Sequence, residues 1–204
     1  IGDWMRARGC RDEITICTKI SGGRGAPELI APALEASLER LRTGHVEIYK
    51  MHSPDPNPPI GETLHAMTEQ VTAGRTRVIG GANYAAPQLQ EALDASASRC
   101  YERFEITQPN YNLAVPEAPE ELFPLCRREE ISVTSYSPLG AGFLTGKYTP
   151  DRSKIPERTR MHVAPGHIDI YFQERAYSGV EITPSKATSI LSAAALSMPG
   201  IKWP

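Results

Sequence analysis

The sequence lacks the features of several protein classes. No apolar run approaches the roughly 20 residues that a membrane-spanning helix needs, and no signal peptide is visible. The charges nearly balance, with 22 Lys and Arg against 24 Asp and Glu, and no basic cluster stands out. These absences predict a protein with no membrane partner and no nucleic-acid partner.

Cysteine is scarce and irregularly spaced. The four residues are Cys10, Cys17, Cys100 and Cys126, and none forms a C-x-x-C pair. Their spacing, with only five scattered histidines, gives no zinc pattern. We therefore expect reduced thiols, a cytoplasmic location and no metal site.

The composition is that of an ordinary globular protein, with 40% hydrophobic and 23% charged residues. A chain of 204 residues can bury a sizeable core, and no linker divides it. We therefore expect a single domain over residues 1–204. The chain starts at Ile1, within an expected helix over residues 1–8, which suggests a piece of a longer protein.

Apolar alternation predicts five strands, and helical spacing predicts helices around them. The strands are expected over residues 14–19, 45–52, 77–80, 104–108 and 131–136. Helices are expected over residues 27–41, 62–73, 87–96, 119–129 and 185–196, and a long loop with one short helix over 149–179. Strands and helices that alternate in this way predict parallel βαβ units. This pattern alone leaves open a doubly wound sheet and a (β/α)₈ barrel.

A polar residue stands at the end of each expected strand. These residues are Lys19, His52, Asn83, Gln108 and Tyr136. A lone histidine in such a place more often only bonds a loop, but five such residues at one edge of a sheet indicate a shared site. A lysine can lower the pKa of a catalytic acid, a histidine can donate to a carbonyl oxygen, amides can bind an amide, and an aromatic ring can stack on a planar heterocycle.

A glycine-rich segment, SPLGAGFLTGK, follows Tyr136. Such a segment lets backbone N–H groups approach a phosphate closely, and Lys147 adds a positive charge. It is neither a P-loop nor a G-x-G-x-x-G after a first strand, so those nucleotide-binding folds do not match.

Five segments together resemble the aldo-keto reductases: ITICTK, LERLRTGHVEIYKMHSPDP, GRTRVIGGANY, ITQPNYN and SYSPLGAGFLTGKY. The resemblance implies a (β/α)₈ TIM barrel that binds NADP(H) and reduces small aldehydes or ketones with an Asp, Tyr, Lys and His tetrad. It implies that Lys19 and His52 are catalytic and that Asn83 and Gln108 hold the nicotinamide carboxamide. Tyr136 would stack on the nicotinamide. The pyrophosphate and adenosine side would be lined by Ser137, Pro138, Leu139, Gly140, Ala141 and Lys147.

The chain also departs from the pattern of that family. The resemblance implies that strands 3 to 7 of the barrel are present and that strands 1, 2 and 8 are missing. The family Asp and the proton-donating Tyr have no counterpart here, and Ala82 stands where the family usually has Ser. We therefore expect a truncated chain that is inactive alone.

A second hypothesis is a non-catalytic relative that binds the cofactor, such as a potassium-channel β subunit or a pseudoenzyme. His52 favours a reductase, because the channel subunits carry Asn at that position. The missing Tyr favours the non-catalytic relative. The sequence predicts neither the particular carbonyl substrate nor the oligomeric state.

Overall fold

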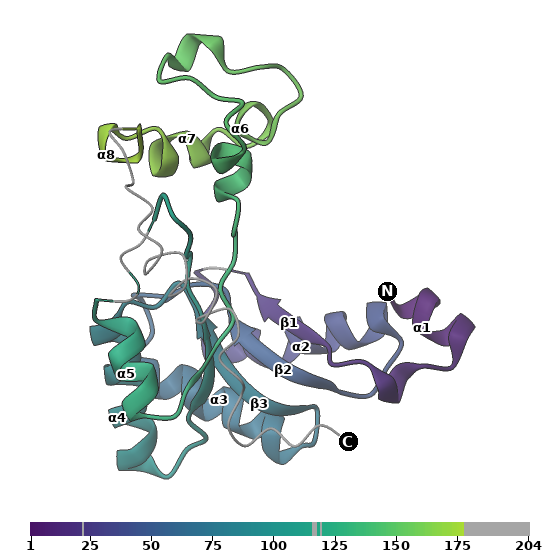
Figure 1. Ribbon diagram of the computed structural model, residues 1–204. Coiled ribbons are helices and arrows are strands. Elements are labelled where there is room, and N and C mark those ends of the chain that lie inside the picture. Colours follow the sequence, from purple (N-terminus) through teal and green to yellow (C-terminus); the bar gives the residue numbers. More distant parts are fainter. Residues whose placement is uncertain (22, 116–117, 119, 178–204) are drawn as a thin grey trace. The chain divides into compact units, whose positions relative to one another are not determined.

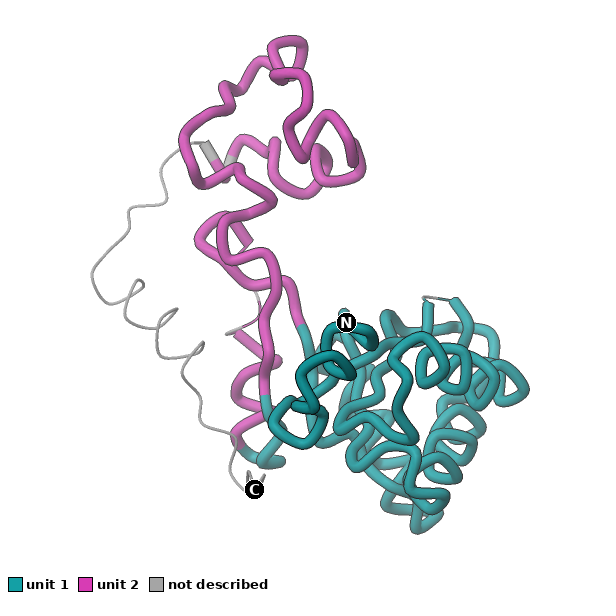
Figure 2. The backbone as a smooth tube through the Cα atoms, turned by 90° about the vertical axis from the view of Figure 1, so that its right-hand side faces the viewer, with its two compact units in different colours: residues 1–108, 128–132 teal, residues 109–127, 133–204 magenta. Residues whose placement is uncertain are grey.

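A computed structural model describes residues 1–21, 23–115, 118 and 120–177. The helix expected over residues 185–196 lies outside the described residues. The chain divides into two compact units, drawn in different colours in Figure 2. Unit 1 comprises residues 1–108 and 128–132, and unit 2 comprises residues 109–127 and 133–204. The single domain over residues 1–204 stays a prediction.

Unit 1 follows the predicted alternation of helices and strands. Its elements are α1 (Gly2–Arg8), β1 (Cys17–Ile20), α2 (Pro27–Leu41), β2 (Val46–Met51), α3 (Ile60–Thr72), β3 (Thr76–Ala82), α4 (Ala86–Arg99) and β4 (Phe104–Gln108), with a 3₁₀ turn at Arg11–Glu13. Helix α1 ends at Gly9, which takes the left-handed conformation (φ 63°) that a residue with a Cβ adopts at a cost. The predicted end of this helix is confirmed.

The strands of unit 1 pair in parallel and in chain order. The register aligns Lys19 with Lys50 and Lys50 with Gly80, and the sheet order is β1-β2-β3-β4-β5, where β5 is Ser132–Val133. Helices α2, α3 and α4 lie side by side along one face of this sheet (Figure 1). The predicted α/β class with a parallel sheet is confirmed, and the closed (β/α)₈ barrel stays a prediction.

Helices α2 and α3 each pack against the sheet through apolar side chains on one helix face. In α2 the stripe is Ile30, Leu34 and Leu38, at the four-residue spacing that places side chains on one helix face. In α3, Leu64 and Met67 are fully buried. Burying each such side chain contributes about 1.5–3 kcal/mol, so this packing fixes the sheet on which the strand ends are arranged.

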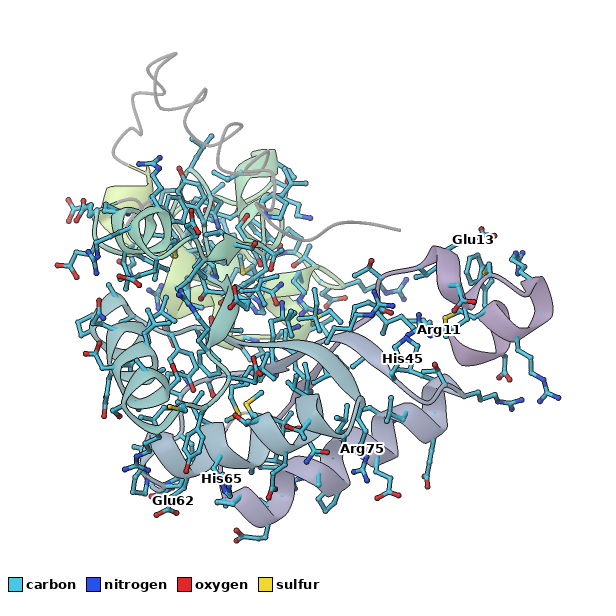
Figure 3. The ribbon with its side chains drawn as sticks, turned by 90° about the horizontal axis from the view of Figure 1, so that it is seen from below. Arg11, Glu13, His45, Glu62, His65 and Arg75 are labelled. Atoms are coloured by element: carbon cyan, nitrogen blue, oxygen red, sulfur yellow. The ribbon has the colours of Figure 1, made fainter. Side chains whose placement is uncertain are left out.

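An ion-pair network lies at the amino-terminal edge of the sheet, where Arg11 and His45 approach each other (Figure 3). The Arg11 guanidinium donates to the His45 carbonyl oxygen (2.7 Å) and to Glu47 Oε1 (3.1 Å). Glu47 Oε2 accepts the Ile16 N–H (2.7 Å). Burial by itself would raise the pKa of Glu47, but the Ile16 N–H and Arg11 together hold it below its ordinary value.

Unit 2 is built from short elements. They are α5 (Leu122–Arg128, whose last residue belongs to unit 1), the 3₁₀ turns η2 (Gly140–Thr145) and η3 (Arg152–Lys154), and the helices α6 (Arg160–Val163), α7 (Gly166–Tyr171) and α8 (Glu174–Tyr177). The prediction of one short helix in the loop over 149–179 was wrong, because η3 and three short helices occupy its described part. An aromatic cluster that includes Phe143, Tyr148, Tyr171 and Phe172 forms the core there.

The last strand is shorter than predicted. The expected strand over 131–136 is wrong in length, because β5 covers only Ser132–Val133. Tyr136 joins Asn110 in an isolated parallel bridge instead, and its N–H donates to the Pro109 carbonyl (3.1 Å). The Tyr111 N–H returns a longer bond to the Tyr136 carbonyl (3.5 Å). Pro109 itself has no N–H, so one donor of a regular ladder is absent just before this bridge.

Candidate functional site

Four of the predicted residues meet at one edge of unit 1. Lys19 is the second-last residue of β1, His52 directly follows β2, Asn83 directly follows β3, and Gln108 ends β4. Because these strands are parallel neighbours, their carboxyl ends share an edge. His52 and Asn83 are exposed there, and Lys19 and Gln108 are half-buried.

Asn83 ties three adjacent strand ends together. Its backbone N–H donates to the Gln108 carbonyl (3.1 Å), and its Nδ2 donates to the His52 carbonyl (2.8 Å). Asn83 takes the left-handed conformation (φ 60°), which asparagine tolerates better than most residues with a Cβ. The conformation therefore serves to hold His52, Asn83 and Gln108 as one group.

The structure adds Lys50, a residue that the sequence predictions missed. Lys50 lies two residues before His52 in β2 and is only 2% exposed. Its Nζ donates to Gln108 Oε1 (2.8 Å). Burial lowers the pKa of Lys50, Cys17 opposes that shift, and the charge of Lys19 adds to it. A lysine two residues before His52, and so on the same face of the strand as a predicted site residue, was the signal available in the sequence.

The loops after β1 and β2 are clamped to one another. Asp55 Oδ2 accepts the Gly25 N–H (2.8 Å), and Thr63 Oγ1 donates to the Gly25 carbonyl (2.7 Å). A Cβ on Gly25 would stand 2.9 Å from the Asp55 Cβ, so this close approach requires glycine. Hydrogen bonds from the backbone of Asn57 and Gly25 lower the pKa of Asp55. These hydrogen bonds fix the loop that follows Lys19 against the loop that follows His52.

The remaining predicted residues lie in unit 2. Tyr136 is half-buried, and burial together with the neighbouring Tyr171 raises its pKa. The segment after it contains several left-handed residues, namely Ser137 (φ 56°), Gly140 (φ 58°), Ala141 (φ 54°) and Gly142 (φ 90°). Pro138 and Leu139 are exposed between them. Left-handed residues among right-handed ones turn backbone N–H groups toward a common side and favour an anion there.

Lys147 lies against this turn. A Cβ on Gly142 would stand 2.9 Å from the Lys147 Nζ, so the ammonium lies over the backbone at that position. The same ammonium lies 5.4 Å from the centre of the Tyr148 ring. A glycine-rich turn with a cation held over it has the donor set that a phosphate group requires, so residues 137–147 fit the phosphate side of a dinucleotide.

A buried hydrogen-bond network contacts the glycine-rich turn over residues 137–142. Asn112, 1% exposed, donates through Nδ2 to the Ser137 carbonyl (3.0 Å) and to the Tyr171 hydroxyl (3.4 Å). Asn110 Nδ2 also donates to the Tyr171 hydroxyl (3.2 Å). A Cβ on Gly140 would stand 3.2 Å from the Tyr171 ring. Tyr171, from α7, thus positions the turn both by ring packing and through Asn112. The sequence predictions missed both Asn112 and Tyr171.

Sequence comparison identifies the family. The profile of the aldo/keto reductase family matches residues 1–195. The chain belongs to the aldo/keto reductase family. The resemblance carried by the five segments is therefore confirmed at the level of the family.

Individual aldo/keto reductases agree with this assignment. The chain is 31% identical over 170 residues to aldo-keto reductase YhdN of Bacillus subtilis, covering 79% of this chain and 50% of that protein. It is 34% identical over 158 residues to a probable voltage-gated potassium channel subunit beta of Arabidopsis thaliana, covering 74% of this chain and 48% of that protein. The chain spans about half the length of the curated relatives it matches.

A solved aldo/keto reductase shares the fold. The enzyme from Klebsiella pneumoniae in complex with NADPH superposes with a TM-score of 0.62 at 26% identity, over 72% of this chain and 49% of that one. Among the residues that the structure describes, no helix has the length and apolarity to cross a membrane. In the same residues no group of three or more His, Cys, Asp and Glu side chains is placed to hold a metal ion.

Proposed function

We propose that the full-length protein is an NADPH-dependent oxidoreductase that reduces small aldehydes or ketones to alcohols. In this proposal the chain supplies strands 3 to 7 of a (β/α)₈ barrel in the cytoplasm. The observation that carries it is the hydrogen-bonded group of His52, Asn83 and Gln108 at one sheet edge, with Lys19 beside it. The match to the aldo/keto reductase family supports the same chemistry.

The bound NADPH would supply the hydride, and the residues of this chain would do the remaining work. His52 would donate a hydrogen bond to the carbonyl oxygen and polarise it. Lys19 would lower the pKa of the proton-donating tyrosine that family resemblance places upstream of Ile1. Holding these groups at fixed strand ends removes the entropy of bringing them together in each turnover.

The family resemblance assigns cofactor contacts to residues of each unit. In unit 1, the carboxamide of Gln108, with Asn83 beside it, would bind the nicotinamide amide. In unit 2, Tyr136 would stack on the ring, and the turn over residues 137–142 with Lys147 would take the phosphates. The Tyr136 ring is uncharged at physiological pH, because the pKa of a tyrosine is ordinarily about 10 and burial raises it further, and an uncharged ring suits stacking.

A second candidate is a non-catalytic subunit that binds the cofactor. The match to the Arabidopsis potassium channel subunit is the observation that favours it. His52 argues for the reductase, because a channel-type relative has no need of a donor to a carbonyl oxygen.

The test is NADPH consumption with an activated aryl aldehyde such as nitrobenzaldehyde. We expect the full-length protein to turn over at about 1 s⁻¹ or faster, within the ordinary range of enzymes. The 204-residue chain alone should show no turnover, since losing a general acid costs about 10²–10⁴-fold. A full-length protein that binds NADPH but reduces none of a panel of aldehydes and ketones would favour the non-catalytic subunit.

A further inference from the structure

Lys50 is a buried cation in contact with a residue of the proposed nicotinamide site. Its backbone is central in the sheet, aligned with Lys19 on one side and Gly80 on the other. Its side chain is 2% exposed, and its Nζ lies 2.8 Å from Gln108 Oε1. The chemistry described above, with Lys19 and His52 as the working groups, makes no use of it.

The contact fixes the orientation of the Gln108 carboxamide. An ammonium group only donates hydrogen bonds, so the carboxamide must turn its oxygen toward Lys50. The amide nitrogen of Gln108 therefore takes the other end and is the end presented to a ligand. The contact also places the positive charge of Lys50 next to Gln108, so that only the Gln108 side chain separates this charge from a ligand bound to its amide nitrogen.

The two forms of the cofactor differ in charge at that point. The nicotinamide ring of NADP⁺ carries a positive charge, and the dihydronicotinamide ring of NADPH is neutral. A buried ammonium nearby repels the first form and not the second, and screening is weak in a buried site. Lys19, the second-last residue of the neighbouring strand β1, adds a charge of the same sign.

We propose that Lys50 orients Gln108 and makes the nicotinamide subsite selective for NADPH over NADP⁺. This inference rests on the proposed function, because it requires the nicotinamide to bind at Gln108. Its consequence is that the oxidised cofactor leaves more readily after each reduction and that NADP⁺ competes less with NADPH for the site.

The experiment measures the dissociation constants of NADPH and NADP⁺ for the full-length protein and its variants. Lys50→Met removes the charge while keeping an unbranched side chain, and Lys50→Arg keeps the charge. Lys154→Met serves as the matched control, since Lys154 is exposed and pairs with Asp151 on the surface. If Lys50→Met does not fold, Lys50→Gln also lacks the charge and serves for the same measurement.

We expect the ratio Kd(NADP⁺)/Kd(NADPH) to fall about tenfold in Lys50→Met, equivalent to about 1.4 kcal/mol. The ratio should be unchanged in Lys50→Arg and in Lys154→Met. A merely structural role would weaken both ligands equally and leave the ratio alone, so an unchanged ratio in folded Lys50→Met overturns the inference. Absence of binding of either cofactor to the unmodified protein would instead overturn the proposed function.

Discussion

The two units position their proposed site residues by different kinds of interaction. In unit 1 the site residues stand on strand ends, and the strands are fixed by regular backbone ladders and by apolar stripes on α2 and α3. In unit 2 the glycine-rich turn rests on a polar network in which Asn112 bonds Ser137 and Tyr171. The reacting end of the proposed site is therefore built on repeating structure, and the phosphate end on a few individual side chains.

This difference bears on how each part tolerates change. Ladder bonds are shared among many residues, so no single side chain decides where a strand ends. A network of three or four buried polar groups fails when one of them is removed, because the others lose partners inside the protein. We therefore expect single substitutions in unit 1 to act on chemistry and those in unit 2 to act on stability and cofactor affinity.

The largest effect is expected at Lys19 in unit 1. Lys19→Met in the full-length protein should lower kcat by about 10²–10⁴-fold with little change in NADPH affinity, since the lysine acts on the proton donor. Steady-state NADPH consumption and a fluorescence titration measure the two quantities. Lys154→Met is the control. A variant that keeps more than about a tenth of kcat would remove Lys19 from the mechanism.

The next effect is expected at Tyr171 in unit 2. Tyr171→Phe deletes the hydroxyl that bonds Asn110 and Asn112, and should lower the free energy of unfolding by about 1–3 kcal/mol. Tyr148→Phe is a matched control in the same unit, because the buried Tyr148 hydroxyl has no hydrogen-bond partner among the described residues. Urea denaturation compares them, and equal effects of the two would contradict the importance of the network.

The comparison also explains what the sequence could predict. The bounds of α2 and β4 were predicted correctly, because helical spacing, Pro27 at the helix start and an apolar strand are all local signals. The ends of β1, β2 and β3 lie within two residues of the predicted positions, which was enough to place Lys19, His52, Asn83 and Gln108 at one edge of the sheet. Their roles in catalysis and binding stay predictions.

The features missed by sequence reasoning depend on contacts between distant residues. Asn112 and Tyr171 are 59 positions apart, and no periodic pattern connects them. Lys50 was missed because a lysine in a strand usually faces water, and only the fold shows it buried against Gln108. The early end of β5 coincides with Pro109 on the neighbouring segment, a residue that lacks the N–H of a regular ladder.

A smaller effect is expected at Tyr136 in unit 2, the residue proposed to stack on the nicotinamide. Tyr136→Ala should weaken NADPH binding by about 1 kcal/mol or more, the size of an aromatic stacking interaction. Titration of NADPH fluorescence against the full-length protein and the variant measures it. An unchanged Kd would make Tyr136 a packing residue only.

The smallest effect is expected at Glu47, far from the proposed chemistry but within unit 1. The folded-state pKa of Glu47 is lowered, so its contribution to stability is present above the unfolded pKa and is lost as pH falls through the folded value. Glu47→Gln should therefore cost up to about 1 kcal/mol near neutral pH and progressively less in acid. Thermal denaturation from pH 7 down to pH 3 measures this, and a cost that grows in acid would contradict it.

Hydrogen exchange with and without NADPH tests both halves of the site in one measurement. Full-length protein at about 100 times the Kd of NADPH gains about 2.7 kcal/mol in the bound state. Segments that open only when the cofactor leaves should therefore exchange about a hundredfold more slowly. We predict this slowing at residues 83–85 and at Gln108 in unit 1, and at Asn110 and residues 137–142 in unit 2. Unchanged exchange at residues 83–85, Gln108 and Asn110 under saturating NADPH would contradict a nicotinamide site at these strand ends.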